Sequence, residues 1–230
     1  MDRQAGTSMT VLYRVFRAIS WFLMHVIFSL QIQNPLEGAV EGPLIICANH
    51  RSYFDIPALI VAYPGQIHFI AKKDFERSWV GPLFRALGVI FVERGTSDIQ
   101  SMRQVLRGLK DGQKIGIFPE GTRVKTYDPS KLKEGVGFLV QHSRCPVLCA
   151  NISGDFRFRG KVTLTWRPVM EFAKDNDLGR KEERALISRE IFDSIYGRQG
   201  SMNFSKTPGK DEEGAKERQK TRGQEGEEGL

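Results

Sequence analysis

Two short loops carry side chains that could do acid–base and anion-binding chemistry. The first is NHRSYFD, residues 49–55, which follows the apolar run PLIICA and places His50 and Asp55 five positions apart. In one continuous helix such positions lie about 140° apart, so the two side chains would not face each other. They can meet if His50 precedes a helix and Asp55 lies in its first turn. Asp55 would then fix the imidazole tautomer, and the other ring nitrogen would accept a proton from a hydroxyl group.

The same seven residues also have a purely structural interpretation. Ser52 is a favourable N-cap residue, and S-x-x-D resembles the capping box found at helix N-termini. On this alternative, Asp55 only holds a backbone N–H group and His50 is an ordinary loop residue. Taken alone, residues 49–55 fit both interpretations.

The second loop is FPEGTR, residues 118–123, which follows another apolar run. Gly121 allows a close approach of the backbone to a ligand. Thr122 offers a hydroxyl group, and Arg123 carries a guanidinium fork that suits a phosphate group. The structural alternative is an ion pair between Glu120 and Arg123, which on an exposed loop would contribute little to stability.

Further cations stand at the exits of two more apolar runs. Lys72 and Lys73 follow IHFIA, and Arg94 follows VIFVE. One such cation by itself would only be solvated. If the preceding strands are neighbours in one sheet, these side chains and Arg123 converge on a pocket for an anion such as phosphate.

The loops belong to an alternation of apolar runs and helical patterns that extends from residue 36 to residue 198. The expected strands are Leu44–Ala48, Ile67–Ala71, Val89–Val92, Ile115–Phe118, Val147–Ile152 and Val162–Trp166. The expected helices are Tyr53–Ala62, Trp79–Leu87, Ile99–Leu109, Gly135–His142 and Lys181–Tyr196. This pattern predicts an α/β fold, with a mixed, mostly parallel sheet flanked by helices. Ligands of such sheets bind outside the carboxyl ends of the strands, where the loops above begin.

The two ends of the chain differ from this central domain. Residues 1–35 contain a basic and then apolar segment, Val11–Leu30, with Arg14 and Arg17 on one side of a helical wheel. This sidedness predicts an amphipathic helix in a membrane interface; a helix packed on the domain, or a spanning helix, are the alternatives. Residues 199–230 are polar and nearly lack apolar side chains, so we expect a disordered tail.

The amino-acid composition limits the classes of partner that the protein could bind. The 230 residues include 34 Lys and Arg against 27 Asp and Glu, a formal net charge of +7. This excess suits an anionic membrane surface or phosphorylated substrates. The basic residues are scattered and no nucleic-acid-binding signature is present, so we expect no nucleic acid partner. The three cysteines lie in apolar segments as expected of buried thiols, and the four histidines lack metal-ligand spacing, so we expect no metal site.

At this point the loops resemble sequence blocks of the glycerolipid acyltransferases, typified by the 1-acylglycerol-3-phosphate (lysophosphatidic acid) acyltransferases. NHRSYFD is similar to their N-H-x-S-x-x-D block, GVIFVER to the second block, FPEGTR to the third and CPVLCANIS to the fourth. The order and spacing of the blocks also match, over roughly residues 40–170. Glu93 replaces the usual Asp of the second block, and Val124 the usual Ser after the third.

The resemblance implies transfer of a fatty acyl group from acyl-CoA or acyl-acyl carrier protein to the hydroxyl of 1-acylglycerol 3-phosphate, which gives phosphatidic acid. His50 would be the general base, oriented by Asp55, and no acyl-enzyme would form. No bound cofactor is implied, and the enzyme would work on the cytoplasmic face of a membrane. The substrate-binding residues that the resemblance implies are Lys72, Lys73, Arg94, Glu120, Gly121, Thr122 and Arg123.

Three alternatives stay open. The first is a sibling acyltransferase whose acceptor is glycerol 3-phosphate, another lysophospholipid or a lyso-aminolipid. The second is a thioester hydrolase in which His50 activates water. The third is a non-catalytic protein whose basic excess only binds anionic lipid.

Overall fold

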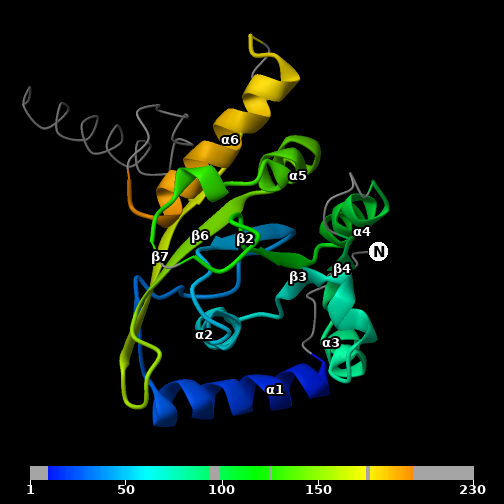
Figure 1. Ribbon diagram of the computed structural model, residues 1–230. Helices are drawn as coiled ribbons and strands as arrows, with labels where there is room; N and C mark the ends of the chain where they lie inside the picture. The colour runs from blue at the N-terminus through cyan, green and yellow to red at the C-terminus, as the bar shows by residue number, and fades with distance from the viewer. Residues whose placement is uncertain (1–9, 94–98, 125, 175–176, 199–230) are drawn as a thin grey trace, which may run out of the picture. The chain divides into compact units, whose positions relative to one another are not determined.

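The computed structural model describes residues 10–93, 99–124, 126–174 and 177–198, which fold around a seven-stranded sheet (Figure 1). The strands are β1 (Ser29–Gln33), β2 (Leu44–Ala48), β3 (His68–Lys72), β4 (Ile90–Val92), β5 (Lys114–Ile117), β6 (Val147–Gly154) and β7 (Lys161–Met170). Their order across the sheet is β1-β7-β6-β2-β5-β3-β4.

Five neighbouring strands run in the same direction. β2 pairs in parallel with β5 and β6, and β3 pairs in parallel with β5 and β4. β7 is antiparallel to β6 and parallel to β1. The sheet is therefore mixed and mostly parallel, which confirms the predicted fold class. The loops after β2, β3, β4, β5 and β6 all leave from one edge, where parallel sheets bind their ligands.

Helices cover both faces of the sheet (Figure 1). The helices are α1 (Val11–Phe22), α2 (Asp55–Ala62), α3 (Gly81–Ala86), α4 (Ile99–Lys110), α5 (Gly135–Ser143) and α6 (Arg180–Ile195). Short π and 3-10 segments are Leu23–Ile27, Lys73–Arg77 and Pro129–Lys131. Side chains of α1 and α2 belong to one hydrophobic core, and those of α4, α5 and α6 to another.

Strand β2 serves both cores. Leu44, Ile46 and Ala48 pack in the core with α1 and α2, whereas Ile45 and Cys47 pack in the other core. Successive side chains of a strand point to opposite faces, so a strand with helices on both faces has no solvent side. That is why this run is continuously apolar. Because β2 is the middle strand of the seven, the loop that follows it lies at the centre of the carboxyl end of the parallel strands.

The N-terminal segment differs from the prediction in length. The expected Val11–Leu30 helix ends its α-helical part at Phe22 and continues as a π-helical turn to Ile27. The chain then forms β1, which pairs in parallel with β7 from Ser29 to Gln33. Helical periodicity could not reveal this strand, because its partner lies more than a hundred residues away in the sequence.

The structure shows which side chains of this helix face the domain. Tyr13, Ser20 and Met24 are buried, and the Tyr13 hydroxyl accepts a hydrogen bond from the backbone N–H of Ile67 at 3.0 Å. Burial raises the pKa of Tyr13 to about 12. The exposed apolar side chains of the segment are Val11, Leu12, Val15, Ile19, Trp21, Phe22 and Val26. The helix thus packs on the domain, as one alternative had it, and still presents an apolar face outward.

Among the helices of the described ranges, none is both long enough and apolar enough to cross a bilayer. Arg94 and the predicted tail 199–230 lie outside the described residues. The domain boundaries near residues 35 and 198 therefore stay predictions.

Candidate active site

The loop after β2 brings His50 and Asp55 into contact. Nδ1 of His50 lies 2.9 Å from Oδ2 of Asp55. Helix α2 begins at Asp55, so the histidine precedes the helix and the aspartate occupies its first turn, as the spacing required. Asp55 is fully buried, whereas the His50 side chain keeps 19% of its surface exposed. With Nδ1 engaged as a donor, Nε2 is the ring nitrogen left to accept a proton.

The Asp55 carboxylate also accepts hydrogen bonds from the backbone of the loop that precedes it. The same oxygen, Oδ2, accepts the backbone N–H groups of Arg51 at 2.6 Å and Ser52 at 2.7 Å. The Ser52 hydroxyl accepts from the N–H of Phe54 at 3.2 Å, so the full capping box is not formed. Charge-assisted bonds of this kind are among the stronger hydrogen bonds. The same oxygen of Asp55 therefore both holds the backbone of the loop and contacts the His50 imidazole.

Phe118, the residue after β5, holds the His50 ring from another side. The two rings are stacked, with centroids 4.1 Å apart and planes at 19°. Phe118 stacks in turn on Phe69 of β3 at 6.2 Å. The sequence analysis assigned no role to Phe118, since only the pairing of β2 with β5 brings it against the imidazole.

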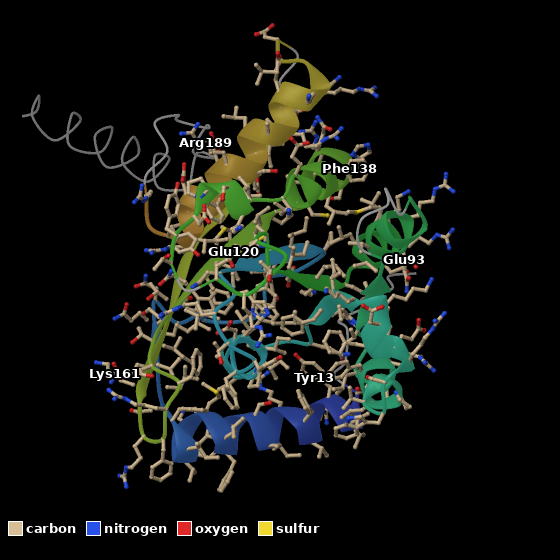
Figure 2. The ribbon with its side chains drawn as sticks, in the orientation of Figure 1. Tyr13, Glu93, Glu120, Phe138, Lys161 and Arg189 are labelled. Atoms are coloured by element: carbon tan, nitrogen blue, oxygen red, sulfur yellow. The ribbon has the colours of Figure 1, made fainter. Side chains whose placement is uncertain are left out.

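Glu120 is turned inward and joins the two loops. Glu120 lies in the interior of the fold (Figure 2), and its side chain is 1% exposed. Oε2 accepts a hydrogen bond from the backbone N–H of His50 at 2.7 Å, and Oε1 accepts one from the hydroxyl of Tyr196, just after α6. The backbone N–H of Val124 donates to the carbonyl of His50 at 2.7 Å. These bonds replace the surface ion pair with Arg123 that was the structural alternative. Tyr196 had no signal in the sequence, because it stands at the end of an ordinary amphipathic pattern.

We call the hydrogen bonds of Glu120 to Tyr196 and to the His50 backbone the Glu120 clamp. Burial shifts the pKa values of its side chains. Desolvation raises the pKa of Glu120 above its ordinary value of 4.5, and the hydrogen bonds from Tyr196 and from the His50 backbone oppose that rise. Burial, together with Glu120, also raises the pKa of Tyr196, so its hydroxyl remains a donor. A carboxyl whose pKa is raised on folding holds its proton more tightly in the folded state. The contribution of Glu120 to stability therefore falls as pH rises from about 4.5 through the raised pKa.

Tyr196→Phe tests the clamp. At neutral pH we expect the free energy of unfolding to fall by about 1–3 kcal/mol, because a buried carboxylate loses a donor. Below pH 4.5, where the raised pKa keeps Glu120 protonated, the loss should shrink. Urea unfolding followed by circular dichroism measures both values. The control Tyr127→Phe removes a hydroxyl that lies 3.1 Å from Oδ1 of Asp193, and it should cost about 1 kcal/mol at both pH values. A Tyr196→Phe loss that does not depend on pH would contradict this account.

The rest of the second loop faces outward beside His50. Gly121 has a φ of +64°, in the left-handed region that favours glycine. Thr122 and Arg123 are exposed. The guanidinium carbon of Arg123 lies 3.7 Å from the ring centroid of Tyr53, a cation–π contact that holds the arginine against the first loop. Histidine and guanidinium are therefore presented by adjoining loops at one edge of the sheet.

Of the other predicted cations, the structure describes Lys72 and Lys73 at the end of β3. Lys72 ends β3, and Nζ of Lys73 lies 3.7 Å from the Glu93 carboxylate in a pair that is about half exposed. Such a pair contributes little to stability. Arg94 lies outside the described part of the chain. The convergence of four cations stays a prediction.

The cysteines are not placed to act as nucleophiles. All three are buried free thiols, as their apolar surroundings predicted. Burial raises the pKa of Cys47, and it raises the pKa of Cys149 to about 12, so both remain protonated. Across the described ranges, no cluster of three or more His, Cys, Asp or Glu side chains is arranged to hold a metal ion. At this sheet edge the group suited to take up a proton is the His50 imidazole.

Comparisons with known proteins identify the family of the chain. A sequence model of the family described as Acyltransferase matches residues 25–153. The 1-acyl-sn-glycerol-3-phosphate acyltransferase of Bacillus subtilis is 30% identical over 179 residues, which cover 73% of this chain and 89% of that protein. The lyso-ornithine lipid O-acyltransferase of Pseudomonas aeruginosa is 33% identical over 125 residues, which cover 53% of this chain and 46% of that protein.

Human 1-acyl-sn-glycerol-3-phosphate acyltransferase alpha is 29% identical over 136 residues, which cover 55% of this chain and 47% of that protein. The crystal structure of the 1-acyl-sn-glycerophosphate acyltransferase PlsC from Thermotoga maritima has a TM-score of 0.59 at 20% identity, over 84% of this chain and 81% of that one, which shows a shared fold. The family match takes in both loops of the site and more than half of the sequence. The chain therefore belongs to the acyltransferase family that includes the 1-acyl-sn-glycerol-3-phosphate acyltransferases.

Proposed function

We propose that the protein transfers a fatty acyl group from an acyl thioester to the free hydroxyl of 1-acylglycerol 3-phosphate and so forms phosphatidic acid. The observation that carries this proposal is the buried Asp55 carboxylate bonded to His50, with the guanidinium of Arg123 on the adjoining loop. The name of the Bacillus subtilis relative, matched over 89% of its length, supports the same acceptor.

In the proposed step, Nε2 of His50 accepts the hydroxyl proton of the acceptor as the oxygen attacks the thioester carbonyl carbon. The ester C–O bond forms, the C–S bond breaks, and the thiolate leaves and takes up the proton. Asp55 keeps the proton of Nδ1 in place and stabilises the imidazolium that forms. Attack is direct, so no acyl-enzyme intermediate is required.

Arg123 is proposed to hold the phosphate group of the acceptor. Its guanidinium is exposed, always charged and shaped for two parallel hydrogen bonds to phosphate oxygens. Gly121 and Thr122 shape the loop that presents it, and Glu120 acts from behind by fixing the backbone of that loop to His50. We propose that Arg94 and one of the two lysines after β3 complete the phosphate pocket.

Arg123→Ala is expected to raise KM for 1-acylglycerol 3-phosphate about tenfold or more, because a charge-assisted hydrogen bond contributes about 1.5–3 kcal/mol. The kcat value should change much less, since His50 is untouched. Initial rates measured against each substrate separate the two effects. Arg107→Ala, on α4, is a charge-matched control and should behave as wild type. A rise in KM for the acyl donor alone would show that Arg123 binds the other substrate.

The donor is proposed to be acyl-CoA or acyl-acyl carrier protein, used as a co-substrate. The lysophospholipid acceptor and the phosphatidic acid product reside in a bilayer, so we place the enzyme on the cytoplasmic face of a membrane. The exposed apolar side chains of α1 and the net charge of +7 both suit an anionic lipid surface.

A lyso-aminolipid acceptor is a second candidate, favoured by the 33% identity to the lyso-ornithine lipid O-acyltransferase. Purified protein given a labelled acyl thioester should make phosphatidic acid faster than it acylates lyso-ornithine lipid or glycerol 3-phosphate. Faster acylation of one of the other two acceptors would make that compound the substrate in place of 1-acylglycerol 3-phosphate.

The same assay tests the two remaining alternatives. Release of free fatty acid without ester formation would indicate a hydrolase. Membrane binding without turnover of any acceptor would indicate a non-catalytic lipid-binding protein.

A further inference from the structure

The turn between β6 and β7 presents an exposed aromatic ring among basic side chains. Phe158 is 75% exposed, and its neighbours Arg157, Arg159 and Lys161 are exposed as well. The acidic residue of the turn is Asp155, whose carboxylate lies 2.7 Å from Nε of Arg157 in a solvent-exposed pair. Three cations and one carboxylate therefore surround a ring that gains nothing from burial within the domain.

Hydrogen bonds hold this turn in a fixed position against the N-terminal segment. The backbone N–H of Arg159 donates to the carbonyl of Ile27 at 2.7 Å, and the N–H of Ser29 donates to the carbonyl of Gly160 at 3.0 Å. The turn is tight, because a Cβ at Gly160 would lie 2.2 Å from the carbonyl oxygen of Asp155. Figure 1 shows the turn reaching the end of α1. The backbone of the turn is therefore held beside Ile27 and Ser29, just past the helical segment whose apolar side chains are exposed.

The turn also belongs to the edge of the sheet that carries the active site. β6 is parallel to β2, with Ala150 opposite Ala48, and it continues to Gly154 beyond the point where the His50 loop begins. Asn49 and Ile152 exchange two hydrogen bonds, from Nδ2 to the carbonyl oxygen at 2.8 Å and from the backbone N–H to Oδ1 at 2.7 Å. The end of β6 and the start of the catalytic loop are thus joined directly.

An aromatic cluster reinforces this connection. Phe156, at the base of the turn, lies 5.6 Å from Phe28 and 5.9 Å from Phe54 between ring centroids, and Phe28 lies 4.8 Å from Phe54. Phe54 is the residue before Asp55. The base of the turn therefore packs against the residue that precedes Asp55.

We propose that Arg157, Phe158 and Arg159 form a second membrane anchor beside α1. Phe158 inserts at the level of the lipid headgroups and upper acyl chains, while the two arginines and Lys161 bind anionic headgroups. Together with the exposed face of α1, the anchor holds the active-site edge against the bilayer. The purpose of this orientation rests on the proposed function, but the binding itself does not.

Vesicle co-sedimentation of the full-length protein tests the anchor, with phosphatidylcholine vesicles prepared with and without phosphatidylglycerol. Phe158→Ser should weaken partitioning onto the anionic vesicles about tenfold, the effect expected for exposing one apolar side chain. The double variant R157Q/R159Q should weaken it about tenfold or more and reduce the preference for phosphatidylglycerol. These side chains are exposed, so the variants should keep their fold.

Two controls match these changes on other surfaces. Val169→Ser alters a side chain that is 43% exposed near the far end of β7, about 26 Å along the strand from Lys161. Arg189→Gln alters an exposed arginine of α6, which Figure 2 shows far from Lys161. Both should bind vesicles as the wild type does.

Two outcomes overturn the anchor. One is that both turn variants bind vesicles as the wild type does. That result is also expected if the turn contacts a protein and not a membrane. The other is an equal loss of binding in the controls. A wild-type protein that binds vesicles through the turn but transfers no acyl group would contradict the proposed function and leave the anchor intact.

Discussion

His50→Ala should lower the rate of acyl transfer by about 10²–10⁴-fold while the protein stays folded. The alanine removes the imidazole that Asp55 and Phe118 hold in place. It keeps the backbone N–H that Glu120 accepts, so the two loops remain joined. The loss should therefore appear in kcat. Initial rates with 1-acylglycerol 3-phosphate and a labelled acyl thioester, together with circular dichroism, measure activity and fold.

His142→Ala is the matched control for this experiment. The ring of His142 on α5 is stacked on Phe138 at 4.0 Å, and its Nδ1 bonds the carbonyl of the same residue at 2.8 Å. It therefore has a stacked and hydrogen-bonded imidazole, but its bonding partner is a backbone carbonyl and not a carboxylate. Its removal should leave turnover unchanged. Near-wild-type turnover by a folded His50→Ala protein would exclude His50 as the general base.

Asp55→Ala should cost as much activity as His50→Ala and should also destabilise the fold by about 1–3 kcal/mol. The additional cost arises because the backbone N–H groups of Arg51 and Ser52 lose their buried acceptor. Asp55→Asn separates the two effects. Its amide oxygen can still accept bonds from the loop, so most of the stability should return, but it offers the imidazole no negative charge. Urea unfolding and initial rates on the same preparations test both statements.

A double variant shows whether Asp55 works through His50. When one group acts only through another, removing both costs little more than removing either one. The protein with both His50→Ala and Asp55→Ala should therefore be about as slow as His50→Ala alone. Losses that multiply would give Asp55 an independent role, and an Asp55→Asn enzyme with wild-type kcat would remove its orienting role.

The sequence by itself determined most of the elements, β1 excepted, and the residues that follow the strands. β2 is bounded as predicted, and α2, α4, α5 and α6 lie within one or two residues of their expected bounds. Local chemistry is sufficient there, because apolar runs and helical periodicity record which faces are buried. The meeting of His50 with Asp55 could also be anticipated, since only a loop followed by a helix turn lets residues five apart converge.

Only the tertiary structure decided what comes from distant parts of the chain. The strand β1 exists because β7 pairs with it, and Tyr196 reaches Glu120 because α6 packs against the sheet beside the second loop. The same holds for Phe118, which contacts His50 through strand pairing, and for Phe158, whose place beside α1 depends on hydrogen bonds to Ile27 and Ser29. Periodicity reports which side of an element is buried, but not which element buries it. Contacts between residues far apart in the sequence therefore appear only when the chain is folded.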